Sequence, residues 1–231
     1  FHFPRPRYDR SMKAWPVVVV VGQKGSGKSS LGLALAGLSG ADFADLDELV
    51  AREASLPTPR EAWRALGEAE FRRLEALILR RELEGARTAL AGGAEGGPKP
   101  GEPGSGAAIP DGGRPRILAA GGGLADNPAA LEALAEGARS GRFRLLVLRL
   151  PFGLLAERAA ASGYPPSLGP EPSPQAFAAL AERREGAYLA LAGLPGALVL
   201  EAAGLSVREA AGRALSLLDL VPAESAPRRQ A

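Results

Sequence analysis

Residues 17–29, which read VVVVVGQKGSGKS, decide the fold of this chain. The valine run predicts a buried β-strand, and leucines and alanines at helical spacing from Leu31 to Leu38 predict that a helix follows it. Between them lies a G-x-x-x-x-G-K-[ST] motif in the strand, turn and helix context that this motif requires. The backbone N–H groups of such a loop surround phosphate, while its lysine and serine reach the terminal phosphates and Mg²⁺. We therefore expect the loop to bind a nucleoside triphosphate.

Lysine usage supports this interpretation. The chain has lysine only at Lys13, Lys24, Lys28 and Lys99, and it carries arginine at every other positively charged position. A phosphate loop needs a compact ammonium group, for which the larger planar guanidinium is a poor substitute. The presence of Lys28 in an arginine-rich chain favours a phosphate site over an ordinary glycine-rich turn.

The composition excludes several classes of site. The 231 residues include no cysteine and one histidine, His2, and the formal net charge is +2. Disulfides, thiolate metal sites and histidine-based catalysis are therefore not expected. The arginines are scattered among acidic residues, and no apolar stretch approaches the length of a membrane span, so we expect neither nucleic-acid nor membrane binding. We expect a cytoplasmic monomer.

Apolar runs and helical periodicity alternate along the chain, which is typical of a parallel sheet covered on both faces. Strands are predicted at 16–21, 41–44, 116–120, 144–150 and 197–201. Helices are predicted at 28–38, 46–54, 68–90, 128–139, 152–161, 174–191 and 206–219. The pattern predicts an α/β fold with three layers, α/β/α, around a five-stranded parallel sheet.

The same pattern predicts one domain over residues 15–221, with tails at 1–14 and 222–231. Residues 92–113 are mostly glycine and proline and cannot bury enough apolar surface to offset their ordering, so we interpret them as a flexible insertion. Residues 162–175 form a proline-rich irregular segment between two helices. A loop of that length in a compact domain is often a lid over the site.

Four further features are each weak in isolation. Residues 45–48 (DLDE) follow the second strand, and a helix-capping box would explain them equally well. Residues 67–75 (GEAEFRRLE) open an amphipathic helix, where a surface ion pair between Arg72 and Glu75 would be unremarkable in energy. Residues 121–123 (GGG) end the third strand. Arg183 and Arg184 precede Tyr188 on a helix, where solvated charge is the ordinary explanation.

Taken in order, these motifs resemble the shikimate kinase family, from about Val17 to Leu220 with an interruption at 92–113. That family shows a phosphate loop, D-x-D after the second strand, G-E-x-x-F-R-x-x-E, a triple glycine, and a late arginine before a tyrosine. The resemblance implies a nucleoside-monophosphate-kinase-like fold, with Mg²⁺ and ATP. It further implies phosphorylation of the 3-hydroxyl of shikimate, in the biosynthesis of chorismate and the aromatic amino acids.

On the nucleotide side, the resemblance implies that the ATP phosphates are bound by Gly25, Ser26, Gly27, Lys28 and Ser29. Ser30 would lie near the α-phosphate and Arg158 against the adenine. Ser29 would ligate Mg²⁺, and Asp45 would act on the metal through water.

On the substrate side, the resemblance implies that Asp47 binds the shikimate hydroxyls and accepts the proton of the attacking oxygen. Arg72 and Arg184 would bind the substrate carboxylate, with Glu75 holding Arg72 in place. The backbone of the triple glycine, Gly121, Gly122 and Gly123, would also contact the substrate.

One departure from the family concerns the lid. The family carries an arginine directly before a proline there, which neutralises charge on the transferring phosphoryl group. This chain has Tyr164 before Pro165, and no Lys or Arg occurs from residue 159 to residue 182. Two alternatives stay open: a non-catalytic ATP-binding relative, in which that charge is lost, and a kinase for another small anionic hydroxylated substrate. A third possibility is a catalyst in which Arg183 supplies the charge.

Overall fold

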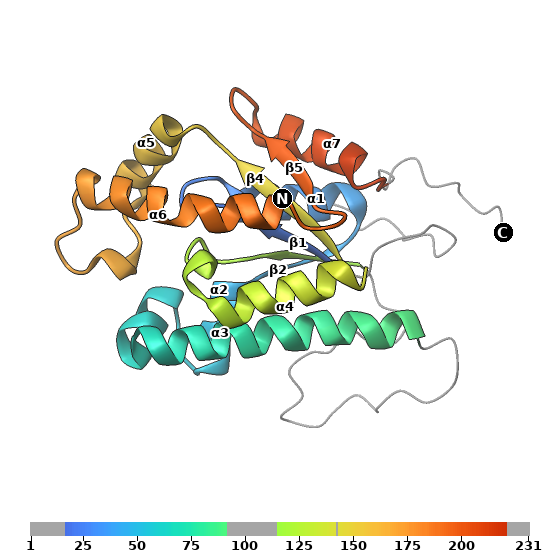
Figure 1. Cartoon of the computed structure of the whole chain (residues 1–231), viewed down its shortest axis with the longest axis horizontal. Coiled ribbons are helices and arrows are strands. Elements are labelled where there is room, and N and C mark those ends of the chain that lie inside the picture. The colour runs from blue at the N-terminus through green and yellow to red at the C-terminus, as the bar shows by residue number, and fades with distance from the viewer. Residues whose placement is uncertain (1–16, 92–114, 142, 221–231) are drawn as a thin grey trace.

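The computed structural model describes residues 17–91, 115–141 and 143–220. Within these residues, five strands form one parallel sheet with the order β2-β3-β1-β4-β5 (Figure 1). The strands are β1 (Val17–Val21), β2 (Asp42–Asp45), β3 (Arg116–Ala119), β4 (Arg144–Arg149) and β5 (Leu198–Glu201). The central strand β1 aligns Val18 with Ile117 of β3 and Val19 with Leu145 of β4.

Helices connect successive strands and cover both faces of the sheet (Figure 1). They are α1 (Lys28–Ser39), α2 (Leu46–Glu53), α3 (Pro59–Ala91), α4 (Pro128–Arg139), α5 (Phe152–Ser162), α6 (Pro174–Ala192) and α7 (Val207–Leu217). Two short 3-10 turns, η1 (Leu124–Asp126) and η2 (Pro166–Leu168), precede α4 and α6. Side chains cap several helices: Asn127 accepts from the N–H of Ala130 at the start of α4, and Ser206 and Glu209 form a capping box on α7.

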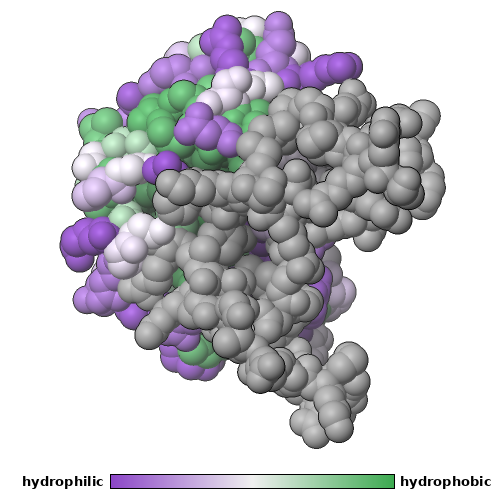
Figure 2. Space-filling view, turned by 90° about the vertical axis from the view of Figure 1, so that its right-hand side faces the viewer, coloured by the Kyte–Doolittle hydropathy of each residue, from purple (hydrophilic) through white to green (hydrophobic). Residues whose placement is uncertain are grey.

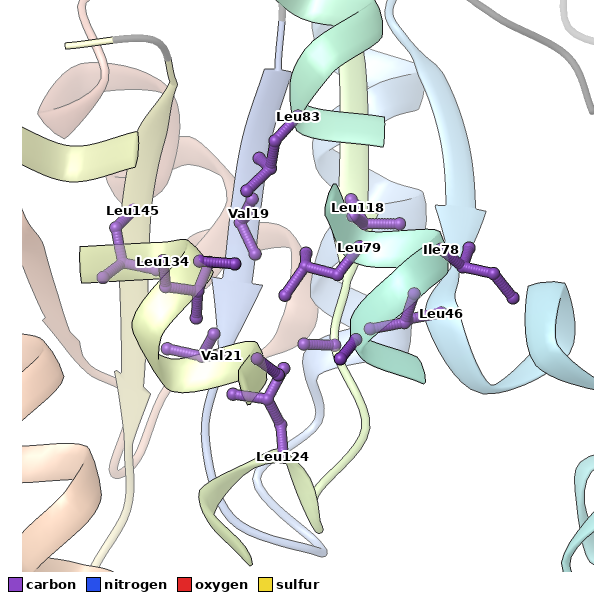
Figure 3. Close-up of a cluster of buried hydrophobic side chains, with 14 of the residues drawn as sticks. Val19, Val21, Leu46, Ile78, Leu79, Leu83, Leu118, Leu124, Leu134 and Leu145 are labelled. Carbon is purple, nitrogen blue, oxygen red and sulfur yellow. The ribbon is translucent and has the colours of Figure 1, made fainter. Parts of the chain in front are cut away.

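The valines of β1 divide the hydrophobic core into two halves, because successive side chains of a strand point to opposite faces. Val19 and Val21 face the side covered by α2, α3, α4 and α6, where they meet leucines of α3 and α4 (Figure 3). Val18 and Val20 face the side covered by α1 and α7. A strand buried on both faces reads as a continuous apolar run, and this explains the five valines.

The structure confirms the predicted α/β architecture, with one difference in α3. The predicted helix at 68–90 instead starts at Pro59, and Gly67 lies inside it with φ 72° and ψ 169°. These angles are non-helical, so α3 is two helical segments joined by a kink at Gly67, where glycine adopts a left-handed φ without strain. The predicted tails at 1–14 and 222–231 and the predicted insertion at 92–113 lie outside the described residues.

Where the described surface is visible on the side that faces right in Figure 1, hydrophilic and apolar side chains are mixed, and the broadest apolar area lies in the upper part of the view (Figure 2). In the part of the chain that the structure describes, no helix is both long and apolar enough to cross a membrane.

Candidate active site

The phosphate-binding loop joins β1 to α1 at the carboxyl end of the sheet. Gly25 and Gly27 have φ of 85° and 92°, a left-handed conformation that residues with a side chain rarely adopt. A Cβ atom on Gly22 would lie 2.5 Å from the backbone oxygen of Leu148, at the end of β4. These three glycines therefore let the loop curl tightly while lying against the neighbouring strand.

Lys28, the first residue of α1, points back into this loop. Its Nζ donates to the backbone oxygen of Gln23 at 2.9 Å and lies 3.5 Å from Oγ of Ser26. The residue is 8% exposed, and burial lowers its pKa to about 8, against the opposing effect of Asp47 and Asp45. Lys28 is thus a buried cation to which none of the described carboxylates is bonded directly, and this suits an incoming phosphate.

Sequence reasoning missed the part played by Gln23. Its Nε2 donates to the backbone oxygen of Ala181 at 3.2 Å and to Oε2 of Glu185 at 2.9 Å, both on α6. These bonds tie the phosphate-binding loop to α6. No motif signals this link, because the partners lie about 160 residues further along the chain.

Ser29 and Asp45 come together at the loop exit. The hydroxyl of Ser29 donates to Oδ2 of Asp45 at 2.6 Å, while Oδ1 of Asp45 accepts from the N–H of Asp47 and caps α2. Mg²⁺ prefers oxygen ligands, and a hydroxyl and a carboxylate beside a phosphate loop provide them, so these two residues fit that cation. Ser30 is exposed on the same turn of α1.

Asp47 is the half-buried carboxylate of the site. Its side chain lies on the triple glycine, so that a Cβ atom on Gly121 would come within 2.2 Å of its Oδ1. Burial raises the pKa of Asp47 to about 7, and the negative charges of Glu75 and Asp45 act in the same direction. A carboxylate with such a pKa is a stronger base than an ordinary aspartate.

Arg72 is fixed from several sides on α3. Its Nη1 donates to Oε2 of Glu75 at 2.9 Å, and Asn127 donates to the same oxygen. Its guanidinium lies 5.1 Å from the ring centre of Trp63, a cation–π contact made by the helical segment before the Gly67 kink. Glu75 is fully buried, so the interpretation as a surface ion pair is wrong. Nε of Arg72 is buried and has no hydrogen-bond partner among the described residues.

The triple glycine also contacts the phosphate loop and Arg72. A Cβ atom on Gly122 would lie 2.9 Å from the backbone nitrogen of Lys24, and one on Gly123 would lie 2.1 Å from Nη2 of Arg72. The hydroxyl of Tyr188 donates to the backbone oxygen of Gly122 at 3.0 Å, and burial raises the pKa of this tyrosine. Three consecutive residues therefore meet Asp47, the phosphate loop and Arg72 in turn.

Gly123→Ala should displace the Arg72 guanidinium, because the backbone of Gly123 cannot retreat without pulling the adjoining glycines from their own neighbours. We expect the KM for an anionic substrate to rise by about tenfold or more, since a charge-assisted hydrogen bond to a desolvated carboxylate is lost. The KM for ATP should change little. Steady-state kinetics with each substrate varied in turn measure both values, and Gly153→Ala, at a position with open space, is the matched control. Equal effects on both KM values would contradict this prediction.

Arg184 is the second predicted carboxylate-binding residue, and it is almost completely buried at 3% exposure. Its Nε and Nη2 donate to Oδ2 of Asp126 at 2.9 and 2.5 Å, and Nη2 also lies 3.4 Å from Oγ of Ser167. Its neighbour Arg183 is exposed and contacts the other oxygen of Asp126 at 3.4 Å. The solvated-charge explanation holds for Arg183 and is wrong for Arg184. Sequence reasoning gave no indication of Asp126.

The remaining predicted residues lie around the loop and the predicted lid. Nη1 of Arg158, on α5, approaches the backbone oxygen of Gly25 at 3.4 Å, which places this side chain beside the phosphate loop. Tyr164, in the predicted lid, stacks at a tilt on Phe177 of α6 with 5.5 Å between ring centres. That tyrosine belongs to an apolar cluster with Leu155 and Ala159, which attaches the start of the lid segment to α5 and α6.

Part of the chain is similar in sequence to shikimate kinases. The family model described as Shikimate kinase matches residues 24–95, a range that contains the phosphate loop from Lys24 onward and also Asp45, Asp47, Arg72 and Glu75. A shikimate kinase of Corynebacterium efficiens is 46% identical over 63 residues, which are 27% of this chain and 37% of that protein. A shikimate kinase of Salinispora arenicola is 44% identical over 81 residues, or 34% of this chain and 48% of that protein. The matched segment thus spans less than half the length of these relatives.

Solved structures resemble the chain over most of its length. A shikimate kinase of Acinetobacter baumannii in complex with shikimate superposes with a TM-score of 0.65 at 22% identity, covering 89% of this chain and 94% of that one. A shikimate kinase of Bacteroides thetaiotaomicron gives 0.61 at 21% identity, covering 88% and 98%. At these identities the likeness shows the fold, a P-loop fold like that of the nucleoside-monophosphate kinases. The sequence similarity to shikimate kinases lies around the loop and α3, where residues 24–95 match the family model.

Proposed function

We propose that this chain transfers the γ-phosphoryl group of ATP to the 3-hydroxyl of shikimate. The observation that carries the proposal is the triple glycine at the end of β3. Gly121, Gly122 and Gly123 lie against Asp47, the phosphate loop and Arg72 respectively. A base, a phosphate site and a carboxylate-binding cation therefore adjoin one short backbone segment, which is the arrangement that a kinase for a hydroxylated acid requires.

The nucleotide half of the proposal rests on the phosphate loop. Lys28 and the loop N–H groups bind the β- and γ-phosphates, and Ser29 with Asp45 holds Mg²⁺, which neutralises charge on the phosphates when bound. Nζ of Lys28 exchanges its hydrogen bond to Gln23 for a phosphate oxygen. No Lys or Arg occurs from residue 159 to residue 182, a range that includes the predicted lid, so the lid brings no positive charge to the transferred group and Lys28 supplies it from the phosphate loop.

The acceptor half rests on Asp47 and Arg72. Asp47 orients the 3-hydroxyl and takes its proton as the oxygen attacks phosphorus, a transfer that its raised pKa of about 7 favours. Arg72 offers Nε, which makes no hydrogen bond to the described residues, to the substrate carboxylate, while Nη1 stays on Glu75. Arg184 is the second cation on this side, and the triple-glycine backbone lies between the two halves.

An assay of ADP release with and without shikimate tests the proposal, with Arg72→Ala as the diagnostic variant. We expect shikimate-dependent ADP release by the parent, and in the variant a KM for shikimate raised by about 30- to 150-fold at nearly unchanged KM for ATP. The matched control is Arg73→Ala, the next residue, whose guanidinium pairs with Glu70 at the surface. Removing that exposed pair should leave both constants close to the parent values.

Two results would decide against the proposal. ATP binding without any shikimate-dependent ADP release would favour a non-catalytic relative. Release stimulated by another hydroxylated acid, and not by shikimate, would keep the kinase and change the substrate.

A further inference from the structure

The carboxylate-binding face of Arg184 is already occupied by a carboxylate of the protein itself. Two of its donors, Nε and Nη2, converge on Oδ2 of Asp126. Arg184 is 3% exposed, and the side chain of Asp126 is 17% exposed, so little water screens the pair. A substrate carboxylate that binds these donors must displace Asp126 from them.

Asp126 is held in place by the backbone around it. It is the last residue of η1, directly after the triple glycine, and its N–H donates to the oxygen of Gly123 at 2.9 Å. The next residue, Asn127, is anchored to the backbone oxygen of Arg72 at 2.8 Å and to Glu75 at 2.9 Å. Burial alone would raise the pKa of Asp126, yet the hydrogen bonds and charge of Arg184, with a smaller effect of Arg183, hold that pKa below its usual value. Asp126 is therefore an ionised carboxylate at neutral pH.

Arg72 is paired differently, and the difference is informative. Its partner Glu75 has no exposed surface and accepts a second hydrogen bond from Asn127, so this carboxylate is a permanent support. One donor of Arg72, Nε, makes no hydrogen bond within the described part of the chain, and its nearest carboxylate is that of Glu68 at 3.9 Å. Asp126, in contrast, is partly exposed and takes two donors of Arg184 on a single oxygen. Arg72 is thus available to a substrate anion as it stands, and Arg184 becomes available only when Asp126 gives way.

We propose that Asp126 is a specificity-determining residue, which competes with the carboxylate of the substrate for Arg184 and thereby weakens the binding of monoanionic acids. This inference rests on the proposed function, because it takes Arg184 to be part of the acceptor site. Asp126 belongs to none of the sequence motifs, so the motifs alone do not predict that it competes for Arg184. The competition arises from a contact between η1 and α6, 58 positions apart in the chain.

The test is the dissociation constant of shikimate, measured by calorimetry on the full chain, for the parent and for Asp126→Asn. The amide keeps the size of the side chain and removes its charge, so we expect the Kd for shikimate to fall by about tenfold, the lower end of the range for a charge-assisted hydrogen bond. The Kd for shikimate methyl ester, which lacks the charge, should not change. The Kd for ATP should also stay constant, which separates competition at Arg184 from a general gain of positive charge.

Two further variants complete the experiment. Asp126→Ala removes the side-chain amide as well and should act in the same direction as Asp126→Asn. The proposal can therefore be tested even if one of the two variants does not fold. Glu132→Gln is the matched control, because it neutralises an exposed carboxylate on α4 that pairs with Arg80 at 3.2 Å, away from Arg184. Melting temperatures of all variants identify any that are unfolded.

A Kd for shikimate that stays the same or rises in both Asp126 variants overturns the proposal. An equal improvement for the methyl ester also overturns it, since the gain would then not involve the carboxylate. Failure of the proposed function looks different: the parent and both variants would bind ATP and none would bind shikimate, in which case the inference falls with the function on which it rests.

Discussion

Lys28→Ala should lower the rate of phosphoryl transfer by about a thousandfold or more while the protein stays folded. The ammonium is buried, and among the described residues it bonds to Gln23 and Ser26 of its own loop and to no carboxylate, so its removal takes away charge from the phosphate site without breaking an ion pair there. Stabilising charge that develops on the transferred group is the largest contribution that such a loop makes. Single-turnover measurement at saturating ATP isolates this step.

Lys28→Arg sharpens this prediction. It keeps the positive charge and replaces a compact ammonium with a planar group, for which a site at 8% exposure has little room. We expect it to fail almost as badly as alanine. Turnover near the parent value in Lys28→Ala would remove the assignment of the ATP site, and the far-ultraviolet circular dichroism of each variant checks the fold.

Asp47→Asn should have the second largest effect, and it should act on activity and stability in opposite directions. Loss of the base should lower kcat by about 10²- to 10⁴-fold. The free energy of unfolding at pH 8 should rise by about 1 to 2 kcal/mol, because a folded-state pKa raised to about 7 means that folding disfavours the ionised carboxylate. The amide has no charge to bury.

The pH dependence of this gain in the free energy of unfolding follows from the upward direction of the pKa shift of Asp47. Below the pKa of the unfolded chain, near 4, Asp47 is protonated in both states and costs nothing. As the pH rises from about 4 to 7, the parent loses stability relative to the variant, and the full difference is reached above 7. Urea unfolding at pH 4 and pH 8 measures this, with Asp42→Asn, an exposed carboxylate at the start of β2, as the control. A gain of equal size at both pH values would contradict the explanation.

The sequence predicted those parts of the molecule whose causes are local. The valine run of β1 and the glycines of the phosphate loop define the strand and the turn within a few residues. Their prediction therefore does not depend on residues far away in the chain. The start of α3 was missed because Gly67 resembles a helix break in sequence. In the structure it is only a kink, and the segment before it brings Trp63 onto Arg72.

The contacts of the candidate site were less predictable, because they join distant parts of the chain. A pair of Arg72 and Glu75 at a spacing of three looks like surface charge until Asn127, 52 positions after Glu75, covers it. Asp126 is an ordinary polar residue before a helix in the sequence. Its meaning depends on the approach of α6, which no periodicity or motif encodes.

The triple glycine has a consequence for how this protein can be altered, by natural variation or by design. At most positions an added methyl group is tolerated, but here each of three adjacent codons encodes a residue that leaves no room for one, and each has a different neighbour. Substitutions at Gly121, Gly122 and Gly123 would impair Asp47, the phosphate loop and Arg72 respectively. Successive substitutions within this segment therefore cannot change the substrate selectivity step by step. Changes of selectivity have to come from substitutions in the neighbouring η1 and α6, which leave the triple glycine unchanged.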